Sequence, residues 1–201
     1  DWQDLQGLQA EQLRADDKWI LARLQRIVRL TEDGLERYSF NEVARNLYDF
    51  IWSEFCDWYL ESCKSAFDSE GAEAAVSRRV FDYAVSVFLR LLHPFMPFVT
   101  EELYHQLGFI GADDSIMLSS WPEAIGDEQL ALLGADPELV RFNEAKFELI
   151  RAVRNLRASY QIPGNRPIKL LLETVSREAE DFLRVDMTAL CSLLNAESVQ
   201  F

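Results

Sequence analysis

The chain has 201 residues, of which 49% are hydrophobic, and a formal net charge of −14. This composition predicts a folded core, built as one large domain or as a domain of about 110 residues with a smaller appendage. The acidic balance argues against nonspecific nucleic-acid binding. A membrane-spanning helix and a secretory signal are excluded because the chain lacks the apolar runs that they require.

The first predicted helix covers about residues 16–36 and carries an apolar stripe at helical spacing. Ser39 and Glu42 then have the spacing of a capping box, in which a hydroxyl and a carboxylate cap the first turn of the next helix. Tyr38 and Val43 occupy the flanking positions of a hydrophobic staple. A second helix is therefore predicted to begin near Ser39.

The second helix is predicted to extend to about Lys64, with Asp68, Ser69 and Gly71 interrupting the chain after it. It is rich in aromatic residues, and its apolar positions follow the 3.6-residue period of a buried amphipathic helix. These positions are held by Leu47, Ile51, Phe55 and Trp58, and Ser62 continues the same spacing.

A third helix is predicted over about residues 73–92, and it ends at the sequence His93-Pro94-Phe95-Met96-Pro97. Pro97 suits the first turn of a short fourth helix, and Gly108 suits its C-terminal cap. Four helices with short connections predict an antiparallel bundle.

The remainder of the chain predicts a different architecture. Its glycines, prolines and scattered acids indicate a linker that lies over the bundle, followed by a fifth helix and a small β-α-β unit. The predicted fifth helix covers 137–160, and the β-α-β unit consists of a strand at 168–173, a helix at 177–194 and a strand at 198–201. The predicted domains are the bundle at 1–108, the linker at 109–136, and the helix with its α/β appendage at 137–201.

The charge is distributed unevenly. Between Arg141 and Lys169 there are seven basic residues and two acidic ones. An acidic protein with one basic stripe fits a partner that is a polyanion bound along a restricted face. It fits equally an ordinary solvated helix face, and the residues alone leave both interpretations open.

Signatures of catalysis and metal binding are missing. The chain has no Gly-rich phosphate loop, no GxSxG elbow and no HExxH motif. Cys56, Cys63 and Cys191 form no CxxC pair, and with His93 and His105 they do not predict a zinc site. Reduced thiols of a cytosolic protein are expected. The sequence therefore predicts no catalytic residue and no metal ligand.

Three segments together resemble the anticodon-binding helical domain of valyl-tRNA synthetases, which are class I aminoacyl-tRNA synthetases. The first is Cys56-Asp57-Trp58-Tyr59 with Glu61 and Lys64. The second is the run from Leu91 to Leu103 around His93-Pro94-Phe95-Met96-Pro97. The third is Arg151-Ala152-Val153-Arg154-Asn155-Leu156-Arg157, followed by Ile162-Pro163. Smaller similarities at Asp17-Lys18-Trp19-Ile20-Leu21, at Ile116-Met117-Leu118, which matches a family strand, and at Trp121-Pro122 extend the resemblance over most of residues 17–172.

The resemblance implies a mainly α fold: an antiparallel helix-bundle anticodon-binding domain with a small α/β appendage. It implies a non-catalytic module of a cytoplasmic ligase that joins valine to its tRNA through a valyl-adenylate, using ATP with magnesium. The partners implied are the tRNA for valine and the catalytic and editing domains of the same parent chain, with no membrane and no DNA. The alternatives are the corresponding fragment of an isoleucyl enzyme and a helical protein-interaction module. Because the chain starts at Asp1 without Met, we expect it to be a piece of a longer protein.

An anticodon loop presents unstacked bases and phosphates, which aromatic planes and cations bind. Arg151, Arg154 and Arg157 step three residues at a time along one helix and are the main candidates for tRNA-backbone contact. Trp52 and Lys64 are further candidates, although Trp52 also fits a core position and Lys64 also fits a helix C-terminus. Trp58 and Tyr59 are predicted to be packing residues.

Overall fold

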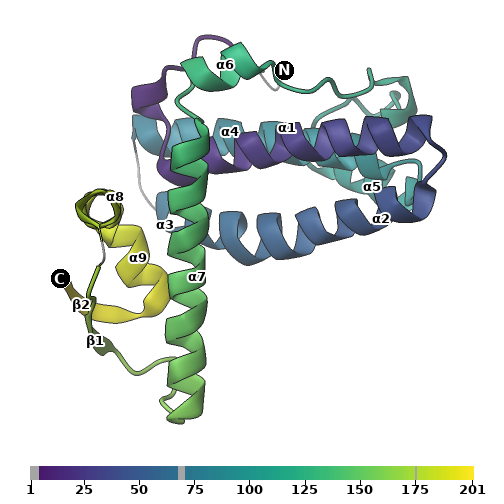
Figure 1. The fold of residues 1–201 in the computed structure, drawn as a ribbon. Helices are drawn as coiled ribbons and strands as arrows, with labels where there is room; N and C mark the ends of the chain where they lie inside the picture. Colours follow the sequence, from purple (N-terminus) through teal and green to yellow (C-terminus); the bar gives the residue numbers. More distant parts are fainter. Residues whose placement is uncertain (1–4, 68–70, 175) are drawn as a thin grey trace.

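The computed structural model describes residues 5–67, 71–174 and 176–201. A short 3₁₀ helix, η1 (Ala10–Gln12), leads into a bundle of antiparallel helices that Figure 1 shows in the upper part of the molecule. The bundle helices are α1 (Ala15–Glu36), α2 (Phe40–Asp49) with its continuations η2 (Phe50–Leu60) and α3 (Glu61–Phe67), α4 (Ala72–Leu92) and α5 (Pro97–Gln106). The predicted bundle is confirmed, and Pro97 and Gly108 lie where the sequence places them; the predicted break at Asp68 and Ser69 lies outside the described residues.

The second predicted helix is continuous through α2, η2 and α3, and its central segment is a π-helix. Its central part, η2, keeps the wider π geometry for 11 residues between the α-helical ends. Trp58 and Tyr59 are both buried although they are adjacent, as predicted for packing residues. They serve different contacts: Trp58 packs on α7 (Pro137–Ser159), whereas Tyr59 donates a hydrogen bond to Asp17 of α1.

The predicted capping box and staple at the start of α2 are wrong. Ser39 makes no side-chain capping hydrogen bond, and Tyr38 has a left-handed backbone and is exposed, so it does not contact the buried Val43. Val43 instead lies against Gly34 of α1, where an added Cβ would stand 2.4 Å from the Val43 methyl. Contact between the two helices, rather than a cap, positions this connection.

A buried carboxylate links three parts of the bundle core. Asp17 is fully buried and accepts hydrogen bonds from the Tyr59 hydroxyl and the Ser77 hydroxyl, both at 2.9 Å. Arg14 completes the set with an ion pair at 2.9 Å. A buried charge is tolerated when it is paired and hydrogen-bonded in this way, so the network fixes α1 against η2 and α4.

The segment 109–136 carries two short helices that the sequence did not predict, η3 (Ile116–Leu118) and α6 (Asp127–Leu132). The strand that the family resemblance implies at Ile116 is wrong: the segment is a 3₁₀ turn in which Ile116 alone is buried. Glu101 of α5 accepts hydrogen bonds from the Ser115 hydroxyl and the Ile116 amide, at 3.0 and 3.3 Å. These bonds attach the turn to the bundle.

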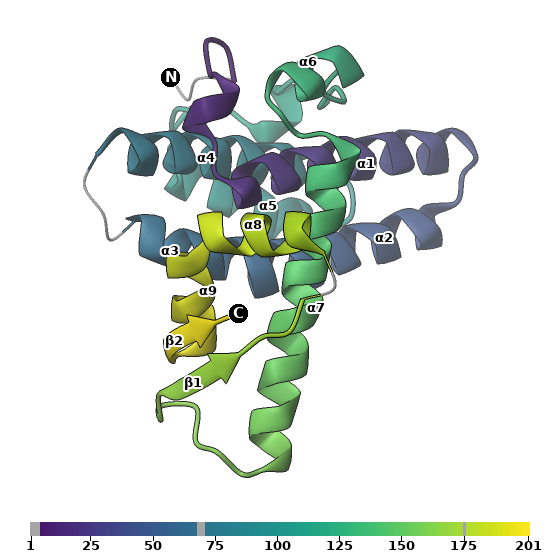
Figure 2. The same cartoon turned by 60° about the vertical axis from the view of Figure 1, so that its left-hand side comes forward.

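The long helix α7 runs across the bundle helices rather than along them and extends beyond them, and the appendage lies along one side of α7 (Figure 1). Asp136 caps its first turn by accepting from the Leu139 amide at 2.9 Å. The appendage contains β1 (Ile168–Leu171), α8 (Arg177–Val185), α9 (Met187–Leu194) and β2 (Ala196–Gln200). The strands pair in parallel, which confirms the predicted β-α-β unit, although its helix is broken into two at Asp186 (Figure 2).

Candidate nucleic-acid interface

An aromatic stack joins α7 to the bundle. The Trp58 ring stacks on the Phe147 ring with centroids 4.6 Å apart and planes 19° from parallel. Trp19 of α1 meets the same Phe147 ring edge-on at 4.8 Å. Such aromatic pairs contribute beyond the area they bury, so this stack sets where the middle of α7 lies on η2.

Two arginines of α7 lie over the outer side of this stack. The guanidinium carbons of Arg151 and Arg154 are 5.7 and 5.6 Å from the Trp58 ring centroid. Arg151 also pairs with Glu148 at 2.6 Å, and Arg154 donates to the Leu193 carbonyl at 3.1 Å. Both side chains are exposed. The two cations are therefore held in place by cation–π contacts while their outer sides face solvent.

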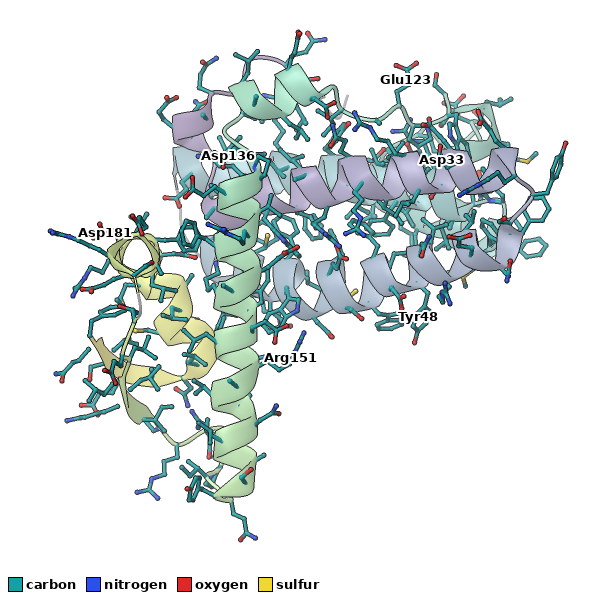
Figure 3. All side chains as sticks on the ribbon, in the orientation of Figure 1. Asp33, Tyr48, Glu123, Asp136, Arg151 and Asp181 are labelled. Atoms are coloured by element: carbon teal, nitrogen blue, oxygen red, sulfur yellow. The ribbon has the colours of Figure 1, made fainter. Side chains whose placement is uncertain are left out.

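The angle between α7 and η2 encloses a groove of about 490 Å³. We call it the corner groove, and its lining residues are Ser53, Cys56, Asp57, Trp58, Glu61, Arg151 and Arg154. Figure 3 shows Arg151 on the side of α7 that faces the underside of the bundle. Lys64, a candidate tRNA contact from the sequence, lies one turn beyond Glu61, and its ammonium is 2.6 Å from the Glu61 carboxylate. The groove thus combines cations, carboxylates and one aromatic wall.

Two exposed aromatic side chains lie on the same underside of the bundle as the groove. Tyr48 and Trp52 form a tilted pair with ring centroids 6.2 Å apart, and Figure 3 shows Tyr48 below α2. The interpretation of Trp52 as a core residue is wrong, because 55% of it is exposed. Exposed aromatic planes near arginine side chains are features on which unpaired bases stack.

Arg157 lies elsewhere than the sequence spacing predicts. Only 7% of it is exposed, and its guanidinium donates to four backbone carbonyls within the appendage and its turn. The acceptors are the carbonyls of Leu194, Pro163, Gly164 and Arg166, at 2.8, 2.7, 3.1 and 2.6 Å. A guanidinium that is saturated internally has little capacity for a phosphate, so we leave Arg157 out of the interface proposed below.

Lys146 is likewise not part of an exposed basic stripe, contrary to the prediction. It is fully buried and its ammonium lies 2.6 Å from both Asp16 of α1 and Asp186 of the appendage. Burial favours a neutral lysine, but the two carboxylates outweigh it and raise the pKa of Lys146. The continuous stripe is therefore wrong: Lys146 is part of an internal ion pair, whereas Arg151 and Arg154 remain exposed at the corner groove.

The cysteines are free thiols, as predicted. Burial raises the pKa of the Cys63 thiol to about 11, which keeps it neutral. Among the described residues, no group of three or more His, Cys, Asp or Glu side chains is placed to hold a metal ion. The side chains at the corner groove offer two guanidinium groups, two carboxylates, a hydroxyl and an indole ring.

Comparison with known proteins identifies the family of the chain. Residues 17–172 match the model described as the anticodon-binding domain of tRNA ligase. Similar curated proteins include the valine–tRNA ligase of Pseudothermotoga lettingae, 38% identical over 86% of this chain and 19% of the relative. That of Thermotoga maritima is 36% identical over 99% of this chain and 21% of the relative. The chain thus spans about a fifth of the length of the relatives it matches. It belongs to the family of anticodon-binding domains of tRNA ligases.

Proposed function

We propose that the chain is the tRNA-binding part of a valine–tRNA ligase, and that it binds the anticodon end of the tRNA for valine. The family match supports the anticodon as the target. Relatives named valine–tRNA ligase, similar over nearly the whole chain, support valine as the amino acid. The role of this chain is to position the tRNA, while the chemistry belongs to the rest of the parent enzyme.

The corner groove is the observation that carries the proposal. Arg151 and Arg154 are fixed over Trp58, so little side-chain freedom is lost when a phosphate binds to them. Tyr48 and Trp52 offer exposed rings on the same side of the molecule for bases splayed out of a loop. Lys64, paired with Glu61 beside the groove, remains a candidate for a backbone contact.

The overall charge explains why binding is confined to this corner. A net charge of −14 repels a polyanion over most of the surface, so only a tRNA that docks in one orientation gains from the arginines. We expect the isolated chain to bind tRNA no better than the micromolar range, about −8 kcal/mol. The catalytic and editing domains of the parent chain supply the remaining affinity.

The reaction of the parent enzyme uses ATP with magnesium, and both bind to domains of that enzyme other than this chain. The sequence has no nucleotide-binding motif, so this chain alone is expected to form no valyl-adenylate from valine and ATP. Within the described part of the chain, none of the helices combines the length and apolar character needed to cross a lipid bilayer. We place the parent enzyme in the cytoplasm, with no DNA partner.

The salt dependence of tRNA binding tests the phosphate contacts. Arg151→Ala and Arg154→Ala should each weaken binding and lower the slope of log K against log salt by about 0.7–0.9, the loss of one phosphate contact. Arg184→Ala makes the same charge change on α8, where Arg184 pairs with Glu180 and does not line the corner groove, and it should leave the slope unchanged. Equal slopes in all three variants would remove the phosphate role.

The two other interpretations give different results in the same assay. The fragment of an isoleucyl enzyme would favour the tRNA for isoleucine over that for valine. A helical protein-interaction module would bind neither tRNA in a salt-dependent manner. Preferential binding of the tRNA for valine, together with a salt slope that falls in Arg151→Ala and Arg154→Ala, separates the proposal from both.

A further inference from the structure

The carboxylate of Asp57 has no function in the fold or in phosphate binding. It is exposed in the corner groove and makes no hydrogen bond or ion pair with a described residue. Neither neighbouring arginine forms an ion pair with it: Arg151 pairs with Glu148, and Arg154 donates to the Leu193 carbonyl. An unpaired negative charge therefore faces the groove in which RNA is proposed to bind.

The helix spacing reinforces this arrangement. Ser53, Asp57 and Glu61 follow one another at four-residue intervals and line the same groove. The middle of this run lies in η2, where the wider π turn keeps residues four apart on one side of the helix. Asp57 is thus placed between a hydroxyl and a second carboxylate, opposite the two arginines. One wall of the groove accepts hydrogen bonds, and the other carries positive charge.

A carboxylate in this position is unfavourable for a phosphate and favourable for a hydrogen-bond donor. Unpaired RNA bases are read on their Watson–Crick edges, and carboxylates accept from exocyclic amino groups. Guanine, adenine and cytosine carry such an amino group on that edge, whereas uracil presents two carbonyl acceptors around a single N–H. We therefore expect Asp57 and Glu61 to favour a base with an exocyclic amino group over uracil, which offers only the single N–H.

We propose that the corner groove is a base-reading pocket, in which Asp57 accepts a hydrogen bond from the exocyclic amino group of an unpaired anticodon-loop base. Glu61 lies beside it as a second acceptor and pairs with Lys64 at 2.6 Å. The backbone of the same nucleotide lies toward Arg151 and Arg154. This inference rests on the proposed tRNA-binding function and adds a specificity-determining residue to it.

The test uses the 201-residue chain and a set of anticodon stem-loop RNAs in which each loop base is replaced in turn by uracil. For the natural chain, one replacement of an amino-bearing base should weaken binding about tenfold. In Asp57→Asn the same replacement should cost less than about twofold, because the amide side chain presents a donor as well as an acceptor. The other replacements should behave identically in both proteins.

Asp33→Asn is the matched control. Asp33 is an exposed carboxylate of α1, and Figure 3 shows it at the end of the bundle away from Arg151, so this variant should retain the natural base preference. Circular dichroism melts establish that both variants are folded. If Asp57→Asn keeps the full base preference while Arg151→Ala still lowers the salt slope, the base-reading role is wrong and the tRNA-binding function stands. If neither Asp57→Asn nor Arg151→Ala changes binding, the base-reading role and the tRNA-binding function are both wrong.

Discussion

The ammonium of Lys146 lies 2.6 Å from the carboxylates of both Asp16 and Asp186. Asp16 belongs to the bundle, Asp186 separates the two helices of the appendage, and Lys146 lies on α7 between them. Burial acts to raise the pKa of Asp16, but Lys146 outweighs it and the pKa of Asp16 is lowered. Burial dominates at Asp186, whose pKa is raised. This one ammonium joins the three parts of the molecule.

Replacing the lysine at this joint should destabilise the protein strongly. Lys146→Met leaves the buried carboxylate of Asp16 and the half-buried carboxylate of Asp186 without their ammonium, and breaking a buried ion pair in this way costs about 3–5 kcal/mol. Urea denaturation measures the loss. Lys169→Met removes an exposed lysine 3.9 Å from Glu197 and should cost less than about 1 kcal/mol. Similar losses in the two variants would mean that the ion pairs of Lys146 do not stabilise the fold.

The tryptophans of η2 provide a second comparison. Trp58 is 7% exposed and stacks on Phe147, so Trp58→Ala should cost about 3–5 kcal/mol in denaturant melts. Trp52 is on the same helix but exposed, so Trp52→Ala should cost less than about 1 kcal/mol while weakening tRNA binding. If Trp58→Ala lowered the unfolding free energy only slightly, the Trp58 ring would lie at the surface and would itself become a candidate for stacking on a base.

The buried thiol predicts how stability depends on pH. The pKa of Cys63 is raised from 9.0 to about 11, so the folded state holds its proton more tightly than the unfolded state. Its stabilising contribution is complete below pH 9 and is lost as the pH rises toward 11, to an extent on the order of 2–3 kcal/mol. Natural protein and Cys63→Ala should therefore converge in unfolding free energy over this range. A constant difference between them would contradict the raised pKa.

Much of the fold follows from local sequence. Helical periodicity, Pro97 and Gly108 predict the bundle helices to within a few residues, because amphipathic stripes and helix stops act locally. The Ser39 capping box failed because the packing of Val43 on Gly34 determines that connection. Likewise, the three-residue apolar run at Ile116 does not distinguish a strand from a single 3₁₀ turn held by Glu101.

The candidate site was less predictable, because sequence spacing does not report burial. Arg151, Arg154 and Arg157 have the same spacing and charge, but the carbonyls that bind Arg157 come from a turn and a helix C-terminus that follow it. The pattern of basic residues also counted Lys146, whose partner Asp16 is 130 positions away. Asp57 belongs to the Cys56–Tyr59 motif, but its position in the groove could not be predicted because the groove forms only where α7 packs across η2.

Competition between two halves of the tRNA tests the central claim most directly. The 201-residue chain is bound at low salt to labelled tRNA for valine, and an unlabelled anticodon stem-loop or an acceptor-stem minihelix is added. The stem-loop should compete within about threefold of whole tRNA, a difference below about 1 kcal/mol. The minihelix should not compete at the same concentrations. Competition by the minihelix equal to that of the stem-loop would contradict an anticodon-binding function for this chain.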